Sequence, residues 1–177
     1  MEWEFMVLNA LQKGRTALWD RLMPCISFLG TWGILWIVIT VLCLAVKQHR
    51  RLGISLAFNM GIDLIACNAL LKPIVARLRP YVLNTTVSLL VPPETEFSFP
   101  SGHTLFAFGA ATILFMYNKK VGTAVYVLAA LIAFSRLYLY MHFPTDVFFG
   151  ALFGVVLALI SYYLDATLFP KSLKRAG

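Results

Sequence analysis

Three short clusters of polar residues interrupt a chain that is otherwise mostly apolar, and their side chains are of the kinds that bind anions and transfer protons. The first cluster supplies two cations, the second a serine, a glycine and a histidine, and the third an arginine, a histidine and an aspartate. Charged groups at the ends of apolar segments are energetically costly and are usually functional. In chain order the positions are Lys72, Arg79, Ser101, Gly102, His103, Arg136, His142 and Asp146.

The first cluster ends an apolar segment with Lys72 and continues to Arg79-Pro80. Ammonium and guanidinium groups in this arrangement can converge on phosphate oxygens. An isolated basic flank would more often extend to the lipid headgroups. We assign that headgroup role to Arg77, so the sequence predicts that removing Arg77 matters far less than removing Arg79.

The second cluster, Pro100-Ser101-Gly102-His103, precedes a long apolar run that starts at Leu105. Ser101 is therefore expected to cap a helix, and Gly102 to allow close approach of the backbone. A helix start exposes N–H groups that bind anions. Simple capping would explain Ser101 and Gly102, but the His103 imidazole could also deliver a proton to a leaving oxygen.

The third cluster has the most specific spacing. Pro144 is expected to begin the last helix, which places His142 just outside that helix and Asp146 in its first turn. The carboxylate could then reach back to one imidazole nitrogen and leave the other free to attack an electrophile. The alternative is a His–Asp pair that only ties a loop to a helix.

Composition decides the solvent in which this chain folds. Of its 177 residues, 60% are hydrophobic and 13% are charged, and the mean hydropathy is +0.79, whereas about a quarter of the residues of a soluble domain are charged. A helix that crosses the hydrocarbon core needs roughly 20 residues. Five segments reach or approach this length: residues 22–46, 52–71, 101–117, 121–138 and 145–164. The predicted fold is an all-α, integral membrane helical bundle.

The amino-terminal 20 residues are predicted to form an interfacial helix. Apolar residues recur at helical spacing among polar ones, and Gly14 is a plausible stop. A cleaved signal peptide is the competing interpretation, but the acidic start argues against it. The whole chain, 1–177, is thus expected to be a single membrane-embedded domain, with the interfacial helix at 1–20, the transmembrane bundle at 22–164 and a cytoplasmic tail at 165–177.

The distribution of basic residues predicts the orientation, because cytoplasmic loops are enriched in Lys and Arg. Basic residues gather in two connections and in the tail: Lys47, Arg50, Arg51, Lys119, Lys120, Lys171, Lys174 and Arg175. These regions are expected on the cytoplasmic side of a multi-pass plasma membrane protein, and all three polar clusters on the outer face. The net charge of +7 then reflects topology together with an anion site, and nucleic acid is not an expected partner.

The three clusters, in this order and spacing, resemble the tripartite signature of the type 2 phosphatidic acid phosphatase superfamily, over residues 72–154. The resemblance implies that His142 is a nucleophile that forms a phosphohistidine, that Asp146 orients it, and that His103 protonates the leaving group and later activates water. Lys72, Arg79, Arg136, Ser101 and the backbone of Gly102 would hold the phosphate. It implies no metal and no other cofactor. The membrane-embedded members usually have a further span in front, which the amino-terminal helix replaces here.

Catalytic residues at a membrane surface favour a lipid phosphate substrate, with membrane lipids around the chain. The layout resembles bacterial undecaprenyl pyrophosphate and phosphatidylglycerophosphate phosphatases; we predict undecaprenyl pyrophosphate, with phosphatidylglycerophosphate, phosphatidic acid or lipid A as alternatives. A channel or transporter is the other class, supported by Asp63, Asn59 and Asn68 within a span. The simpler interpretation of Asp63 is a hydrogen bond inside the bundle. The oligomeric state is left open.

Overall fold

Capping residues explain where several helices begin in the computed structural model, which describes residues 2–168. The Thr16 hydroxyl accepts a hydrogen bond from the backbone N–H of Trp19 (3.4 Å) at the start of α2. Asn118 Oδ1 accepts one from the N–H of Val121 (3.1 Å) at the start of α8. Pro144 begins α9, because its fixed φ suits a first helical position.

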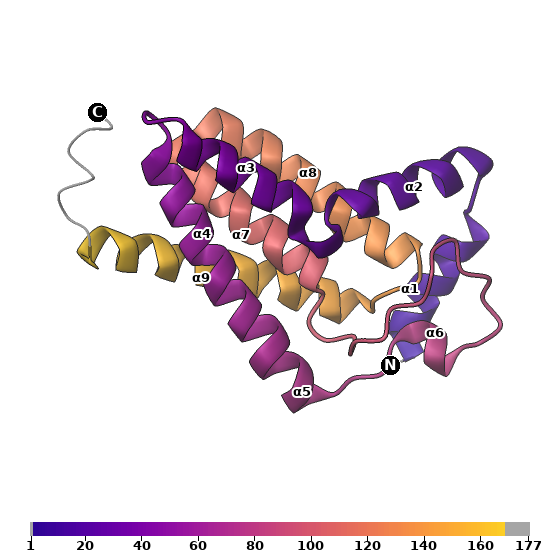
Figure 1. Cartoon of the computed structure of the whole chain (residues 1–177). Coiled ribbons are helices and arrows are strands. Elements are labelled where there is room, and N and C mark those ends of the chain that lie inside the picture. Colours follow the sequence, from indigo (N-terminus) through magenta and orange to yellow (C-terminus); the bar gives the residue numbers. More distant parts are fainter. Residues whose placement is uncertain (1, 169–177) are drawn as a thin grey trace.

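Every regular element within residues 2–168 is a helix (Figure 1), which confirms the all-α prediction. The elements are α1 (Glu2–Lys13), α2 (Ala17–Leu29), the 3-10 turn η1 (Thr31–Gly33), α3 (Ile34–Ala45), α4 (Arg50–Leu64), the π-helical η2 (Ile65–Leu71), α5 (Lys72–Val75), α6 (Pro80–Leu83), α7 (Gly102–Tyr117), α8 (Lys119–Tyr138) and α9 (Pro144–Leu168).

Three segments of the described chain are long and apolar enough to cross a membrane: Arg50–Leu83, Lys119–Tyr138 and Pro144–Asp165. The pair Ala17–Leu29 and Thr31–Ala45 makes a fourth if it is counted as one bent span. The predicted number of five is not confirmed, because α7 has 16 residues, fewer than the roughly 20 that a straight helical span needs.

The first predicted span, 22–46, is not one continuous helix. It consists of the end of α2, the turn η1 and α3, with a bend of 42°. The backbone turns left-handed at Trp32 (φ 54°) and Gly33 (φ 66°), which ends α2 and redirects the chain. The predicted helix over residues 1–20 also divides, since α1 ends at Lys13 and residues 17–20 already belong to α2.

Helix α7 lies in the middle of the bundle and packs against α4, α8 and α9. Its contact with α9 depends on two glycines, because a Cβ on Gly150 would come 2.8 Å from the Ser101 carbonyl oxygen and a Cβ on Gly154 would come 2.4 Å from that of Leu105. This close approach brings the start of α7 against the start of α9, where the N–H of Ser101 donates to the Asp146 carbonyl (3.0 Å). Two of the polar clusters are thereby joined through the backbone.

The two basic connections lie at the end of the bundle away from these helix starts, between α3 and α4 and between α7 and α8 (Figure 1). Helix α1 lies at the opposite end, where the Gln12 side-chain amide donates to the Tyr138 carbonyl (2.8 Å). The basic tail residues Lys171, Lys174 and Arg175 lie outside the described residues.

Candidate active site

The connection between α8 and α9, residues 139–143, carries His142. Tyr140 turns the chain with φ 61°, and the N–H of Met141 donates to the Arg136 carbonyl (3.0 Å). Tyr140 and Phe143 are fully buried, so this connection is packed into the protein. Because α9 begins at Pro144 and Asp146 lies in its first turn, the positions predicted for His142 and Asp146 are confirmed.

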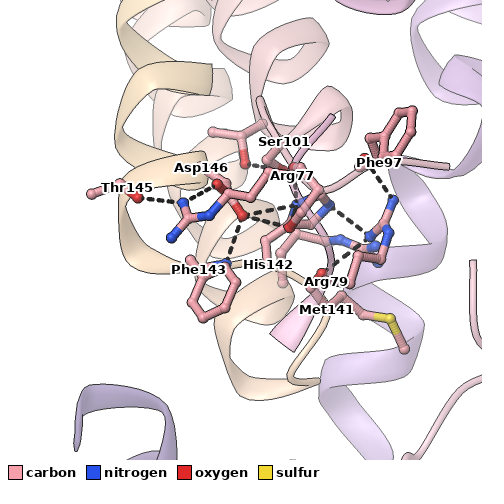
Figure 2. Close-up of polar contacts among 12 residues, drawn as sticks. Arg77, Arg79, Phe97, Ser101, Met141, His142, Phe143, Thr145 and Asp146 are labelled. Atoms are coloured by element: carbon pink, nitrogen blue, oxygen red, sulfur yellow. Dashed lines mark hydrogen bonds and ion pairs between the residues drawn. The ribbon is translucent and has the colours of Figure 1, made fainter. Parts of the chain in front are cut away.

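The hydrogen bonds of the buried His142 ring define its tautomer. Nδ1 is 2.8 Å from the Ser98 carbonyl oxygen, which can only accept, so Nδ1 carries the hydrogen. Nε2 is 3.1 Å from an Arg79 guanidinium nitrogen, which can only donate, so Nε2 carries the lone pair. The ring therefore presents an unprotonated nitrogen toward a cation of the predicted phosphate site (Figure 2).

The sequence predicts a hydrogen bond between Asp146 and His142, but the structure does not have one. Asp146 Oδ2 is 3.8 Å from His142 Nδ1, beyond the range of a hydrogen bond. That oxygen instead accepts from the Ser98 hydroxyl (2.5 Å) and from the N–H of Phe143 (2.8 Å). The Nδ1 hydrogen is already used by the Ser98 carbonyl, so Asp146 acts on His142 through Ser98 and by charge at a distance.

Arg77 is not the headgroup residue that the sequence predicted. Its guanidinium lies between two carboxylates, 2.5 Å from Asp146 Oδ1 and 2.6 Å from Glu4 Oε2. It also lies 4.0 Å from the centre of the Phe143 ring and donates to the Thr145 hydroxyl (2.7 Å). Figure 2 shows it facing Asp146 and Thr145 from one side of the site.

The three cations predicted to hold phosphate are buried, and two acidic residues of one connection hold them together. Glu94 forms ion pairs with Arg79 (2.7 Å) and with Arg136. Glu96 pairs with Lys72 through its side chain, and its carbonyl accepts from Arg79 Nε (2.7 Å). The Glu94 carboxylate reaches both guanidinium groups, so Arg79 and Arg136 converge on a space that a single anion can fill. If the cations bind phosphate, its oxygens would lie where the carboxylates of Glu94 and Glu96 now lie.

Burial and the surrounding cations set the charge states of this group. Burial, helped by Arg79 and Arg136, lowers the pKa of His142 well below its ordinary range, so the ring is neutral. Burial alone would raise the pKa of Glu94, but Arg136 and Arg79 outweigh it and lower the pKa to about 2. The neutral imidazole of His142 thus lies beside Arg79, which is ion-paired with the ionised carboxylate of Glu94.

The second cluster is placed at the start of α7, with one difference from the prediction. Ser101 is the residue before the helix, but its side chain caps no backbone N–H; its hydroxyl pairs with that of Thr104 (2.9 Å). A Cβ on Gly102 would lie 3.9 Å from Lys72 Nζ, so the helix start faces the first cluster. The Nε2 of His103 lies 3.5 Å from the Thr31 hydroxyl.

A cavity of about 710 Å³ adjoins these groups. Five of the eight predicted residues line it, namely Lys72, Arg79, Gly102, His103 and His142. Ser101, Arg136 and Asp146 are not among the lining residues. The rest of the lining comes from the connection around Glu94, from the break at 30–33 and from α3, α4, η2 and α7.

Sequence reasoning missed three residues that support the site: Ser98, Glu4 and Arg77 in its actual position. Ser98 is fully buried and contacts both Asp146 and His142, and its place just before the second cluster was an available signal. Glu4 gave no signal, because its partners Arg77 and Thr145 lie 73 and 141 positions away. Within residues 2–168, no group of three or more His, Cys, Asp or Glu side chains is arranged to hold a metal ion.

Comparison with known proteins agrees with this geometry. The PAP2 superfamily matches residues 49–170. An undecaprenyl-diphosphatase of Sulfolobus acidocaldarius is 34% identical over 143 residues, which are 79% of this chain and 69% of that protein. Two solved structures are also similar: a transmembrane PAP2 type phosphatidylglycerolphosphate phosphatase from Bacillus subtilis, with TM-score 0.77, 26% identity and coverage of 94% and 86% of the two chains, and Aquifex aeolicus LpxE, with TM-score 0.74, 28% identity and coverage of 90% and 94%.

The family match covers most of the chain and includes all eight residues of the three clusters. The protein belongs to the PAP2 superfamily. It is a membrane phosphatase, a hydrolase of phosphoric monoesters or diphosphates. Asp63 has a structural partner inside the bundle, since the Asn59 amide donates to its Oδ2 (2.8 Å).

Proposed function

We propose that this protein removes phosphate from a membrane lipid, without a metal ion, through a phosphohistidine formed on His142. The observation that carries the proposal is the cavity, which extends from His142 and His103 to apolar residues on the outside of the bundle. The reacting groups and a lipid-facing surface therefore share one space.

The far part of the cavity suits an acyl or prenyl chain. Trp32, Ile37 and Leu64 line it, and their exposed fractions are 85%, 46% and 53%. In a membrane, such side chains face hydrocarbon. A lipid whose phosphate reaches Arg79 could keep its tail in the bilayer beside α3 and α4.

The tautomer inferred for His142 supports the following steps. His142 Nε2 attacks phosphorus as the bond to the leaving oxygen breaks, and His103 gives that oxygen its proton. Nδ1 keeps its hydrogen on the Ser98 carbonyl, and Asp146 offsets the positive charge of the phosphorylated ring. His103 then takes a proton from water, which attacks phosphorus and releases His142 and phosphate. Lys72, Arg79 and Arg136 stabilise the charge on the equatorial oxygens.

Undecaprenyl diphosphate is the substrate we favour, supported by the relative from Sulfolobus acidocaldarius. Phosphatidylglycerophosphate, phosphatidic acid and lipid A are the alternatives. All of these lipids carry a phosphate and at least one apolar chain, so the shape of the cavity suits each of them.

We further propose that residues 1–177 form one membrane-embedded domain in the plasma membrane, with about five spans if α7 is counted and with the site on the outer face. The orientation rests on the basic connections, which lie at the end of the bundle away from the site. Single cysteines at exposed positions Thr86 and Lys119, in a cysteine-free background, test it in intact cells. An impermeant maleimide should label position 86; labelling of position 119 alone would reverse the orientation.

The deciding experiment is rapid quench of the purified protein with lipid substrate that carries ³²P in the phosphate to be transferred. An acid-labile, base-stable phosphoenzyme that maps to His142 is expected within the first turnover, and EDTA should not reduce it. Turnover with no phosphoenzyme, or activity lost to EDTA and restored by a divalent cation, would overturn the mechanism. Parallel assays with undecaprenyl diphosphate and phosphatidylglycerophosphate rank the substrates by kcat/KM.

A further inference from the structure

Arg77 joins parts of the chain that are far apart in sequence. Its two ion pairs connect Glu4 of α1 with Asp146 of α9, and both carboxylates are almost completely buried, at 3% and 0% exposure. Glu4 also accepts from the Thr145 hydroxyl (2.6 Å), so it touches the first turn of α9 directly. A buried carboxylate needs a compensating charge, and for Asp146 that charge is Arg77.

Two paths lead from Arg77 to the nucleophile, and both pass through Ser98. In the first, the Arg77 carbonyl accepts from the N–H of Ser98 (2.8 Å). In the second, the Arg77 guanidinium holds Asp146, whose other oxygen accepts from the Ser98 hydroxyl (2.5 Å). Ser98 is thus fixed at its N–H and at its hydroxyl, and its carbonyl accepts the Nδ1 hydrogen of His142. A shift of this peptide would move the hydrogen bond that selects the reactive tautomer.

Arg77 itself does not line the cavity, so it cannot contribute by binding the substrate. Its stacking on the Phe143 ring places it behind His142, on the side away from Arg79. The contribution of Arg77 should therefore appear in the rate of attack and not in substrate affinity.

We propose that Arg77, anchored by Glu4 of the amino-terminal helix, is a positioning residue that sets the tautomer and orientation of His142 through Asp146 and Ser98. The proposal rests on the proposed role of His142 as nucleophile. It makes α1 part of the catalytic apparatus, since the first turn of that helix supplies the anchor.

The test compares Arg77→Met, Arg77→Lys and Glu4→Gln with the control Arg21→Met, a change at an exposed arginine of α2. Arg77→Met should lower kcat about 10- to 100-fold and leave KM within about twofold. Arg77→Lys keeps the charge and should recover part of the rate. Glu4→Gln should lower kcat by a smaller factor, and Arg21→Met should behave as wild type.

A double mutant separates positioning from general loss of structure. If Arg77 acts through Asp146, Arg77→Met should cost little more in the Asp146→Asn protein, because the path is already broken. The proposal would be overturned if the losses of kcat in the two single mutants multiply in the double mutant. It would also be overturned if the Arg77→Met protein folds and forms the phosphoenzyme at the wild-type rate. If the Arg77→Met protein does not fold, kcat and KM of Arg77→Lys and Glu4→Gln, alone and combined with Asp146→Asn, test the proposal in the same way. A wild-type protein that forms no phosphoenzyme would refute the proposed function instead.

Discussion

Each end of the bundle has an arginine–aspartate ion pair between segments that are distant in sequence, Arg51–Asp165 at one end and Arg77–Asp146 at the other, but the surroundings of the two ends differ. At the end away from the site, Arg51 of α4 lies 2.6 Å from Asp165 of α9. The Ser55 hydroxyl donates to the same carboxylate (2.7 Å) and lies 2.8 Å from the Tyr117 hydroxyl. These contacts tie α4, α7 and α9 together, and none of the four residues lines the cavity.

At the site end, the partners of the cations are themselves accessible. The side chains of Glu94 and Glu96 are 33% and 58% exposed, they belong to a connection and not to a helix, and both line the cavity. Arg79 and Lys72, their partners, are almost fully buried. The comparison shows that a buried ion pair alone indicates structure. Buried cations whose carboxylate partners are exposed and line a cavity are the ones that we propose bind a ligand.

The largest expected difference concerns the two histidines at the site. His142→Ala should abolish turnover of every substrate, because it removes the proposed nucleophile. His103→Ala should reduce activity on a lipid alkyl phosphate far more than on an aryl phosphate, since a weakly basic leaving oxygen needs less help from a general acid. Steady-state assays on both substrates check this. Full activity of His142→Ala, or equal losses on both substrates for His103→Ala, would contradict the assigned roles.

Removing one cation from the site end should have the next largest effect. Arg79 is 3% exposed and faces both Glu94 and His142. A hydrogen bond from a charged group contributes about 1.5–3 kcal/mol, so Arg79→Ala should lower kcat/KM about 10- to 150-fold. Arg21→Ala, at an exposed arginine, is the matched control. Similar losses in both variants would place the phosphate site elsewhere.

The cations of the site end also predict how His142 titrates. Burial, Arg79, Arg136 and His103 favour the neutral ring, and Glu94, with Asp146 at 3.8 Å, opposes them. Because the net pKa is lowered, the folded protein binds this proton only well below the ordinary value of about 6.5. The unfolded chain binds it near that value, so stability falls as pH drops below it. In ¹⁵N-histidine NMR, the resonance missing from His142→Ala should titrate well below the ordinary histidine pKa or not at all; a midpoint near the ordinary value would contradict the arrangement.

A smaller effect, on anion binding, is expected from a change at Glu94. Glu94 is ion-paired with two of the cations proposed to bind phosphate, so under that proposal an entering phosphate must displace it. Glu94→Gln should therefore bind vanadate about five- to tenfold more tightly with kcat within twofold, and the exposed Glu2→Gln is the control. Weaker vanadate binding would mean that Glu94 orients the arginines and does not compete for them.

Much of the site could be predicted because its residues are close in sequence. Pro144 fixes the start of α9, and that alone places His142 outside the helix and Asp146 within its first turn. The break at 30–33 was also within reach, since Gly30 and Gly33 flank it and glycines often mark turns. Mean hydropathy across the segment concealed it.

The remaining features depend on tertiary contacts that no local pattern encodes. Arg77 looks like a basic flank in the sequence, and only the packing of α1 against α9 makes it the partner of the buried carboxylates of Glu4 and Asp146. The use of the Ser98 carbonyl, and not Asp146, as the acceptor for His142 depends on a difference of 1 Å, between 2.8 and 3.8 Å. Sequence spacing does not resolve such a difference.

The pair at the far end provides the smallest expected effect on catalysis. Asp165→Asn leaves Arg51 with a weaker partner in a buried position, and breaking a buried pair costs about 3–5 kcal/mol. The thermal unfolding midpoint in detergent should therefore fall clearly. Because Arg51, Ser55, Tyr117 and Asp165 contact neither the cavity nor the nucleophile, kcat and KM of the folded fraction should stay within about twofold of wild type. Asp146→Asn is the matched change at the other end, where kcat should fall together with stability. A large loss of kcat in Asp165→Asn, measured well below its unfolding midpoint, would mean that the two ends are coupled through α9 and that the distinction between a structural and a functional ion pair does not hold in this protein.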